Sequence, residues 1–147
     1  MSAPARSPST PFLLGWSGVI PFAALTLAAL IDWSPFGIDP EAALAAYGAC
    51  ILSFLGGAQW GVLLPRDRTE AHEPWRYAVS VLPQLLAFGC LLLPERLALL
   101  GLIVGFLGLV AYDLSTVRAG LTPPWYGRLR PALTGAVVLL LAVAAIG

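Results

Sequence analysis

Long apolar runs alternate with short polar stretches along all 147 residues of the chain. The first run, residues 12–31, has no charged side chain. It is longer than the apolar core of a signal peptide, which spans about 7–15 residues, so we expect a retained span rather than a cleaved leader. The runs together predict an all-helical bundle of five transmembrane helices, at about 12–31, 42–64, 76–93, 97–117 and 130–146.

Local signals sharpen these boundaries. Asp39 followed by Pro40 and Glu41 is typical of a helix start. Pro21 predicts a kink in the first span, and Pro83 interrupts the short third span. Pro94 predicts a tight turn, so that the third and fourth spans form an antiparallel hairpin. The last span is the shortest, and it crosses fully only if Arg128 and Arg130 extend their side chains to the membrane edge.

Composition agrees with a membrane protein of one compact unit. Hydrophobic residues make up 59% of the chain and charged residues 11%, against about 25% charged in a soluble domain. We therefore expect a flexible N-terminal tail at 1–11 and a single helical domain at 12–147, with the lipid bilayer as its surroundings. The net charge of zero argues against nucleic-acid binding.

Arginine placement predicts an orientation. With five spans, the tail, the second loop and the fourth loop share one side and hold seven arginines, namely Arg6, Arg66, Arg68, Arg76, Arg118, Arg128 and Arg130. The other side holds only Arg96. Because arginine-rich loops stay in the cytoplasm, we expect a bacterial cytoplasmic (inner) membrane protein with its N-terminus inside and its C-terminus outside.

Small residues form a stripe on the second predicted span. They recur every four residues, at Ala49, Ser53, Gly57 and Gly61, and the fourth span carries a second such pair, Gly101 and Gly105. Pairs of this spacing let two helices approach closely. We favour packing within the chain, and association between copies or with a membrane-protein partner remains the alternative. Cys50 and Cys90 are expected to be unpaired rather than joined in a disulfide.

Three polar side chains interrupt the apolar spans: Gln59, Gln84 and Asp113. Counting from the cytoplasmic helix ends places them roughly 6–12 Å below one surface, so they could meet in one layer. An ionisable group within a span needs a partner. Arg118 is the nearest candidate in sequence for Asp113, with Arg76 and Arg66 as alternatives. A structural ion pair is favoured over a proton relay, and glutamines in spans usually serve as hydrogen-bonding links between helices.

Several sequence segments resemble a bacterial and mitochondrial membrane family of unknown function, which includes transmembrane protein 69. They are Gly15-Trp16-x-Gly18-x-Ile20-Pro21-Phe22, Tyr47-Gly48-Ala49-x-Ile51-Leu52-Ser53-Phe54-Leu55-Gly56-Gly57-x-x-Trp60-Gly61, Ser80-Val81-Leu82-Pro83, Asp113 and Pro124-Trp125-Tyr126-x-x-Leu129-Arg130. The resemblance covers nearly the whole chain after the tail and implies a multi-span inner-membrane protein. Members of the family usually have a histidine where this chain has Gln59, which favours hydrogen bonding over proton transfer at this position.

No catalytic constellation, phosphate-binding glycine loop or metal motif is present in the sequence, and the single His72 has no ligand-like neighbour. We therefore expect no enzyme activity, no metal and no cofactor. The favoured function is a packing or assembly partner of other membrane components. The alternative is a carrier or channel for a small solute or proton that uses Gln59, Gln84 and Asp113. An enzyme acting on lipid or quinone is a third hypothesis, and it requires a lateral groove that ends at Asp113 or at the arginines.

Overall fold

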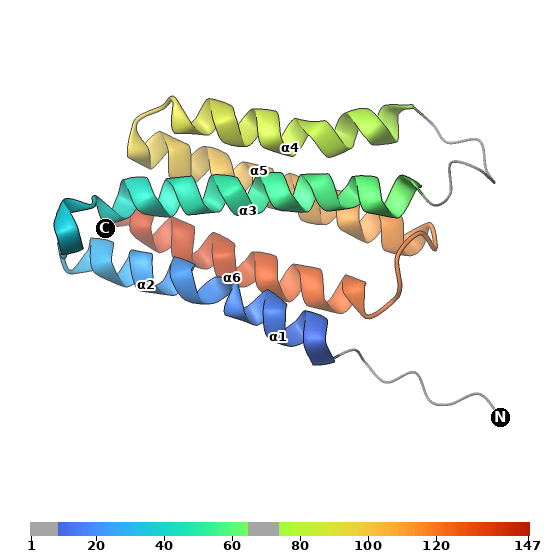
Figure 1. Ribbon diagram of the computed structural model, residues 1–147, viewed down its shortest axis with the longest axis horizontal. Helices are drawn as coiled ribbons and strands as arrows, with labels where there is room; N and C mark the ends of the chain where they lie inside the picture. The colour runs from blue at the N-terminus through green and yellow to red at the C-terminus, as the bar shows by residue number, and fades with distance from the viewer. Residues whose placement is uncertain (1–8, 65–73) are drawn as a thin grey trace.

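The computed structural model describes residues 9–64 and 74–147, and all regular structure in these ranges is helical, which confirms the predicted class. The elements are α1 (Ser9–Ser17), α2 (Val19–Leu30), the short 3-10 helix η1 (Pro35–Gly37), α3 (Pro40–Leu63), α4 (Trp75–Leu91), α5 (Glu95–Arg118) and α6 (Tyr126–Ile146). Figure 1 shows an elongated bundle in which α3 and α5 run in one direction and the other long helices in the opposite direction. Residues 1–8 of the predicted tail lie outside the described ranges, as do Arg6, Arg66, Arg68 and His72.

Four segments in the described part of the chain are long and apolar enough to cross a membrane, one fewer than the five predicted. They are Ser9–Leu30, Pro40–Leu63, Glu95–Arg118 and Tyr126–Ile146. The exception is α4, whose 17 residues rise only roughly 25 Å, against a hydrocarbon core of about 30 Å. The last predicted span, by contrast, is longer than expected, because α6 begins at Tyr126 and continues through Pro131 for 21 residues.

The first spanning segment is broken into two helices. The kink expected at Pro21 lies three residues earlier, at Gly18, where α1 ends and α2 begins. A proline has no N–H for the carbonyl four residues before it, so the preceding turn is weakened. The Tyr47 hydroxyl of α3 donates a hydrogen bond of 3.0 Å to the Gly18 carbonyl and thereby supports the backbone at the break. Residues 9–11, assigned to the tail by sequence, form the first turn of α1.

The start of α3 agrees with its sequence signal. The Asp39 carboxylate accepts a hydrogen bond of 2.9 Å from the Glu41 amide, and Pro40 occupies the first helical position. The carboxylate thus satisfies an amide that has no partner inside the helix. At the same end of the bundle, α4 and α5 are joined by a short turn at Pro94, as expected for a hairpin.

Close approach between α3 and α4 depends on a different glycine from those in the predicted stripe. A Cβ added to Gly56 would lie 2.9 Å from the Ser80 carbonyl oxygen and 3.0 Å from Pro83. A Cβ on Gly57 or Gly61 would meet no described atom within 4 Å. Gly101 and Gly105 lie against neighbours of their own chain, Cys90 and Leu52 respectively. The hydrophobic core continues from there through Phe22, which contacts Tyr47 and Phe106 edge-on.

Candidate functional site

Asp113 is a carboxylate on the buried face of a spanning helix. The buried residues of α5 recur at helical spacing and include Leu99, Leu102, Phe106 and Leu109 before Asp113. Only 1% of the Asp113 residue surface is exposed. The same periodicity that buries the leucines therefore places one charged group inside the bundle, where it requires partners.

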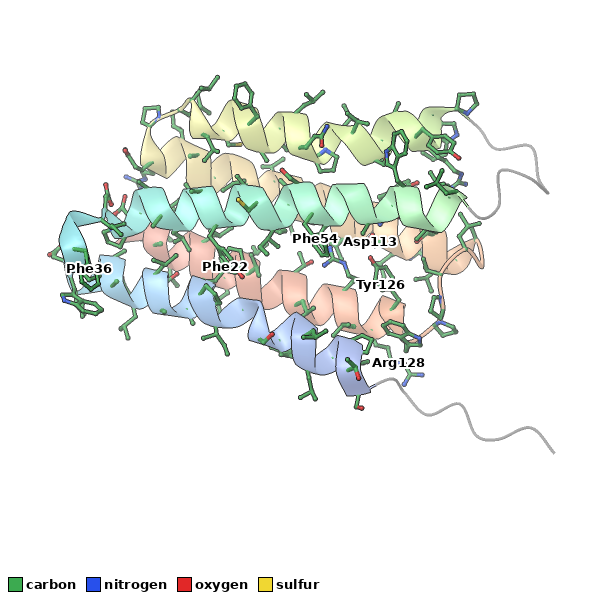
Figure 2. All side chains as sticks on the ribbon, in the orientation of Figure 1. Phe22, Phe36, Phe54, Asp113, Tyr126 and Arg128 are labelled. Carbon is green, nitrogen blue, oxygen red and sulfur yellow. The ribbon has the colours of Figure 1, made fainter. Side chains whose placement is uncertain are left out.

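Three side chains from two other helices supply these partners. Arg130 of α6 donates from Nε to Asp113 Oδ2 at 2.5 Å, and Gln59 of α3 donates from Nε2 to Oδ1. The Tyr126 hydroxyl donates to the same Oδ1 at 3.4 Å. Figure 2 shows Asp113 and Tyr126 toward the end of the bundle at which α6 begins. We call Gln59, Asp113, Tyr126 and Arg130 the polar cluster; it links α3, α5 and α6.

The polar cluster continues into the loop between α5 and α6. The Thr116 hydroxyl donates to the Asp113 carbonyl at 2.7 Å and lies 3.1 Å from the Thr122 hydroxyl. The Leu121 amide donates to the Thr116 carbonyl at 2.8 Å. These contacts tie the start of the loop to the end of α5, one turn from Asp113.

Electrostatically, the polar cluster contains one buried ion pair, between Asp113 and Arg130. Arg130 is 5% exposed, and Gln59 is 2% exposed, so water screens the pair little. The two formal charges cancel, and both carboxylate oxygens have donors. Removing one partner of such a pair leaves an uncompensated buried charge, which costs about 3–5 kcal/mol. The arrangement suits a structural link between helices.

The predicted polar residues do not all meet. Gln59 and Asp113 are in contact, but Gln84 is exposed on the outer face of α4. Arg118, the expected partner of Asp113, is exposed, and Arg130 takes its place. The reason is the direction of the side chain: Arg118 follows Asp113 by five residues and points away from the buried stripe of α5.

A sequence signal for Arg130 does exist. The buried residues of α6 are Leu129, Arg130, Leu133, Thr134, Val137, Leu141, Ala144 and Ala145. Arg130 thus lies on the apolar stripe of its helix, whereas Arg128 is exposed. A basic residue on such a stripe indicates a buried partner, and this signal would have identified the pair. Tyr126, one turn before Arg130, lies on the same side.

The cysteines and the metal-binding residue types give no further site in the described ranges. Cys50 is exposed and Cys90 is buried, and both are free thiols. No group of three or more histidine, cysteine, aspartate or glutamate side chains in these ranges could hold a metal ion.

Comparison with known proteins identifies the family. The model of a family described as "Protein of unknown function (DUF3429)" matches residues 7–146. Transmembrane protein 69 of Xenopus tropicalis is 34% identical over 139 residues, which cover 92% of this chain and 53% of the relative. Transmembrane protein 69 of Mus musculus is 34% identical over 109 residues, covering 73% and 44%.

The chain therefore spans about half the length of these curated relatives. No solved structure matches it significantly. The apolar helices and the relatives agree on a protein of the lipid bilayer. On the family match and the identity across most of its length, the chain belongs to the DUF3429 family of transmembrane proteins, which also includes transmembrane protein 69.

Proposed function

We propose that the protein is a non-enzymatic assembly partner in the bacterial cytoplasmic membrane, and that the outer face of α3 receives a helix of another membrane protein. The observation that carries the proposal is the open position of Gly57 and Gly61. Both glycines are exposed, and a Cβ on either would meet no described atom within 4 Å. Two glycines four residues apart form a shallow groove along a helix, into which a second helix packs closely.

The use of glycine elsewhere in the chain supports this reading. Gly56, Gly101 and Gly105 are closely packed against other residues of the bundle, so that a side chain at any of them would clash. Gly57 and Gly61 have no such contacts, and among the helical glycines of the described ranges that are open in this way, which also include Gly89, Gly108 and Gly135, they are the two that share one helix. Glycine in a helix interior costs about 1 kcal/mol relative to alanine. Exposed aromatic side chains, Phe54 and Trp60, flank the pair and offer contact area to a partner.

The test is a pair of bulky substitutions on the lipid-facing surface. Gly61→Leu should remove a co-purifying membrane protein, because the side chain fills the groove, while the thermal stability of the purified chain stays unchanged. Gly135→Leu is the matched control, since Gly135 is also exposed, helical and free of described atoms within 4 Å. Cross-linking in the native membrane followed by mass spectrometry measures the association. Equal recovery of partner with both variants would contradict the proposal.

We also propose the orientation and a short fifth crossing. The support is the direction of the helices: α3 and α5 run the same way in Figure 1, and α4 runs back between them along the bundle. Arg76, Arg118 and Arg128 then belong to one end of the bundle, and Asp39 and Glu95 to the other. The arginine-rich end is assigned to the cytoplasm, which puts the N-terminus inside and the C-terminus outside.

The carrier hypothesis has weaker support. It required a polar layer of three side chains, and one of them, Gln84, faces outward from α4. The remaining pair, Gln59 and Asp113, is engaged with Tyr126 and Arg130. An assembly role for the outer surface, with the polar cluster as a structural link, fits these contacts better.

A further inference from the structure

An apolar groove lies beside the polar cluster. It has a volume of about 140 Å³ and is walled by α1, α2, α3, α5 and α6. Exposed Leu14 and Phe54 line it, so it opens onto the lipid-facing surface of the bundle. The labelled Phe54 and Phe22 in Figure 2 mark two points along it, of which Phe54 is nearer to Asp113. The groove arises where Gly18 interrupts the first spanning segment.

Two buried polar side chains interrupt this apolar lining: Arg130 and Thr134. They lie one turn apart on α6, and both are at least nine-tenths buried. Arg130 uses Nε for Asp113, but its Nη2 has no hydrogen-bond partner among the described residues, and neither has Thr134 Oγ1. Buried donors are nearly always satisfied in proteins, and an unsatisfied one costs about 1–3 kcal/mol. Both donors belong to residues that line the groove, so an acceptor that enters the groove beside them would supply the partner that neither has among the described residues.

We infer that this groove binds a lipophilic molecule with a neutral carbonyl head group, which accepts hydrogen bonds from Arg130 Nη2 and Thr134 Oγ1. The charge of Arg130 is already balanced by Asp113. An anionic head group would add an unbalanced negative charge in apolar surroundings, which is costly, whereas a carbonyl brings an acceptor without charge. The class therefore includes a quinone ring carbonyl and a lipid ester carbonyl.

The size of the groove sets the part of the ligand that enters. A cavity of about 150 Å³ lined by apolar side chains holds one benzene molecule. The groove therefore accepts one ring or a few methylene groups next to the carbonyl. The rest of the ligand remains outside the bundle, among the lipid chains, through the opening at Leu14 and Phe54.

Thr134→Val tests the inference without disturbing the ion pair. The change keeps the side-chain shape and removes an unsatisfied hydroxyl, so the free protein should be as stable as before. Loss of one hydrogen bond should weaken ligand binding about two- to tenfold. Thr26→Val is the matched control: Thr26 is equally buried, but its hydroxyl donates to the Leu140 carbonyl at 3.3 Å, and it does not line the groove.

The measurement uses the full chain in detergent micelles, with native mass spectrometry and thermal unfolding as readouts. The two probes are a short-chain benzoquinone and a diacyl phospholipid. Saturable binding of the quinone that Thr134→Val weakens supports the site and assigns it to ring carbonyls. The same result with the phospholipid alone supports the site and assigns it to ester carbonyls. If neither probe binds, or if Thr134→Val and Thr26→Val weaken binding equally, the inference is wrong.

A second variant tests the groove itself. Leu55 is half-buried and lines the groove from α3, whereas both hydrogen-bond donors are on α6. Leu55→Phe should fill part of the volume and weaken binding at least tenfold, with the hydrogen-bond donors intact. Unchanged affinity in a folded Leu55→Phe protein would place the probe elsewhere and overturn the assignment. This result is independent of the Gly61→Leu test, because Gly61 lies on the outer surface of α3 and does not line the apolar groove beside Arg130.

Discussion

At the scale of single residues, the main feature is a buried ion pair that joins α5 to α6. Asp113 and Arg130 carry opposite charges in surroundings with almost no exposure, and Gln59 adds a hydrogen bond from a third helix. Such a pair is not required for stability as such, because well-packed apolar residues of similar volume often do as well. It is sensitive, however, to the loss of one partner.

This sensitivity gives a prediction for single and double variants. Asp113→Leu and Arg130→Met should each lower the free energy of unfolding by about 3–5 kcal/mol, because each leaves one buried charge without its partner. The double variant Asp113→Leu/Arg130→Met should lower the free energy of unfolding by less than either single variant, because it leaves no unpaired buried charge. Thermal unfolding in detergent measures the effect, and Arg128→Met, at an exposed arginine of the same helix, is the control. If the loss of stability in the double variant equalled the sum of the two single losses, the two side chains would not be coupled.

At the scale of elements, the break between α1 and α2 is held from outside the segment. The Tyr47 hydroxyl bonds the Gly18 carbonyl, while its ring lies 4.9 Å from that of Phe22. A single residue of α3 thus fixes both the backbone and the side-chain packing at the break. The shape of the first spanning segment depends on α3, not only on its own sequence.

Tyr47→Phe should therefore loosen the break and leave the ring packing intact. Loss of one hydrogen bond should lower the free energy of unfolding by about 0.5–1.5 kcal/mol and speed amide hydrogen exchange near Gly18. Tyr112→Phe is the matched control, since the buried Tyr112 hydroxyl has no hydrogen-bond partner among the described residues. Exchange that rises equally in both variants would show that the hydroxyl bond does not hold the break.

The elements also show what a sequence can and cannot predict. The start of α3 depends on adjacent residues, Asp39 and Pro40, and local signals identified it. The partner of Asp113 depends on how α6 is rotated against α5, and proximity in sequence favoured Arg118 over Arg130. The glycine that contacts α4 is Gly56 and not Gly57, a difference of about 100° around the helix that spacing alone does not decide.

At the scale of the whole molecule, the direction of the helices assigns each loop to one end. The start of α1 and the end of α6 lie at opposite ends of the bundle in Figure 1. The loop between α5 and α6, which contains Gly120, lies at the same end as the start of α1. If α4 crosses the membrane as proposed above, the number of crossings is odd whichever way the protein is inserted.

Reporter fusions test the orientation. An alkaline phosphatase, which is active only outside the cytoplasm, should be active when fused after Gly147 and inactive when inserted at Gly120. A fluorescent protein that folds only in the cytoplasm should give the reverse pattern and serves as the control. Activity of the phosphatase at Gly120 and not at Gly147 would mean that the protein is inserted the other way round.

The shortness of α4 has a consequence for the surrounding lipid. Its outer face is apolar, with exposed Leu82, Leu85 and Phe88, but it has 17 residues where α5 has 24. As a helix, α4 is therefore roughly 10 Å shorter than α5. If α4 crosses the bilayer as proposed, lipid beside it has to compress locally, at a cost of a fraction of a kcal/mol per Å. We therefore expect the bilayer to be thinner beside α4 than around the rest of the bundle.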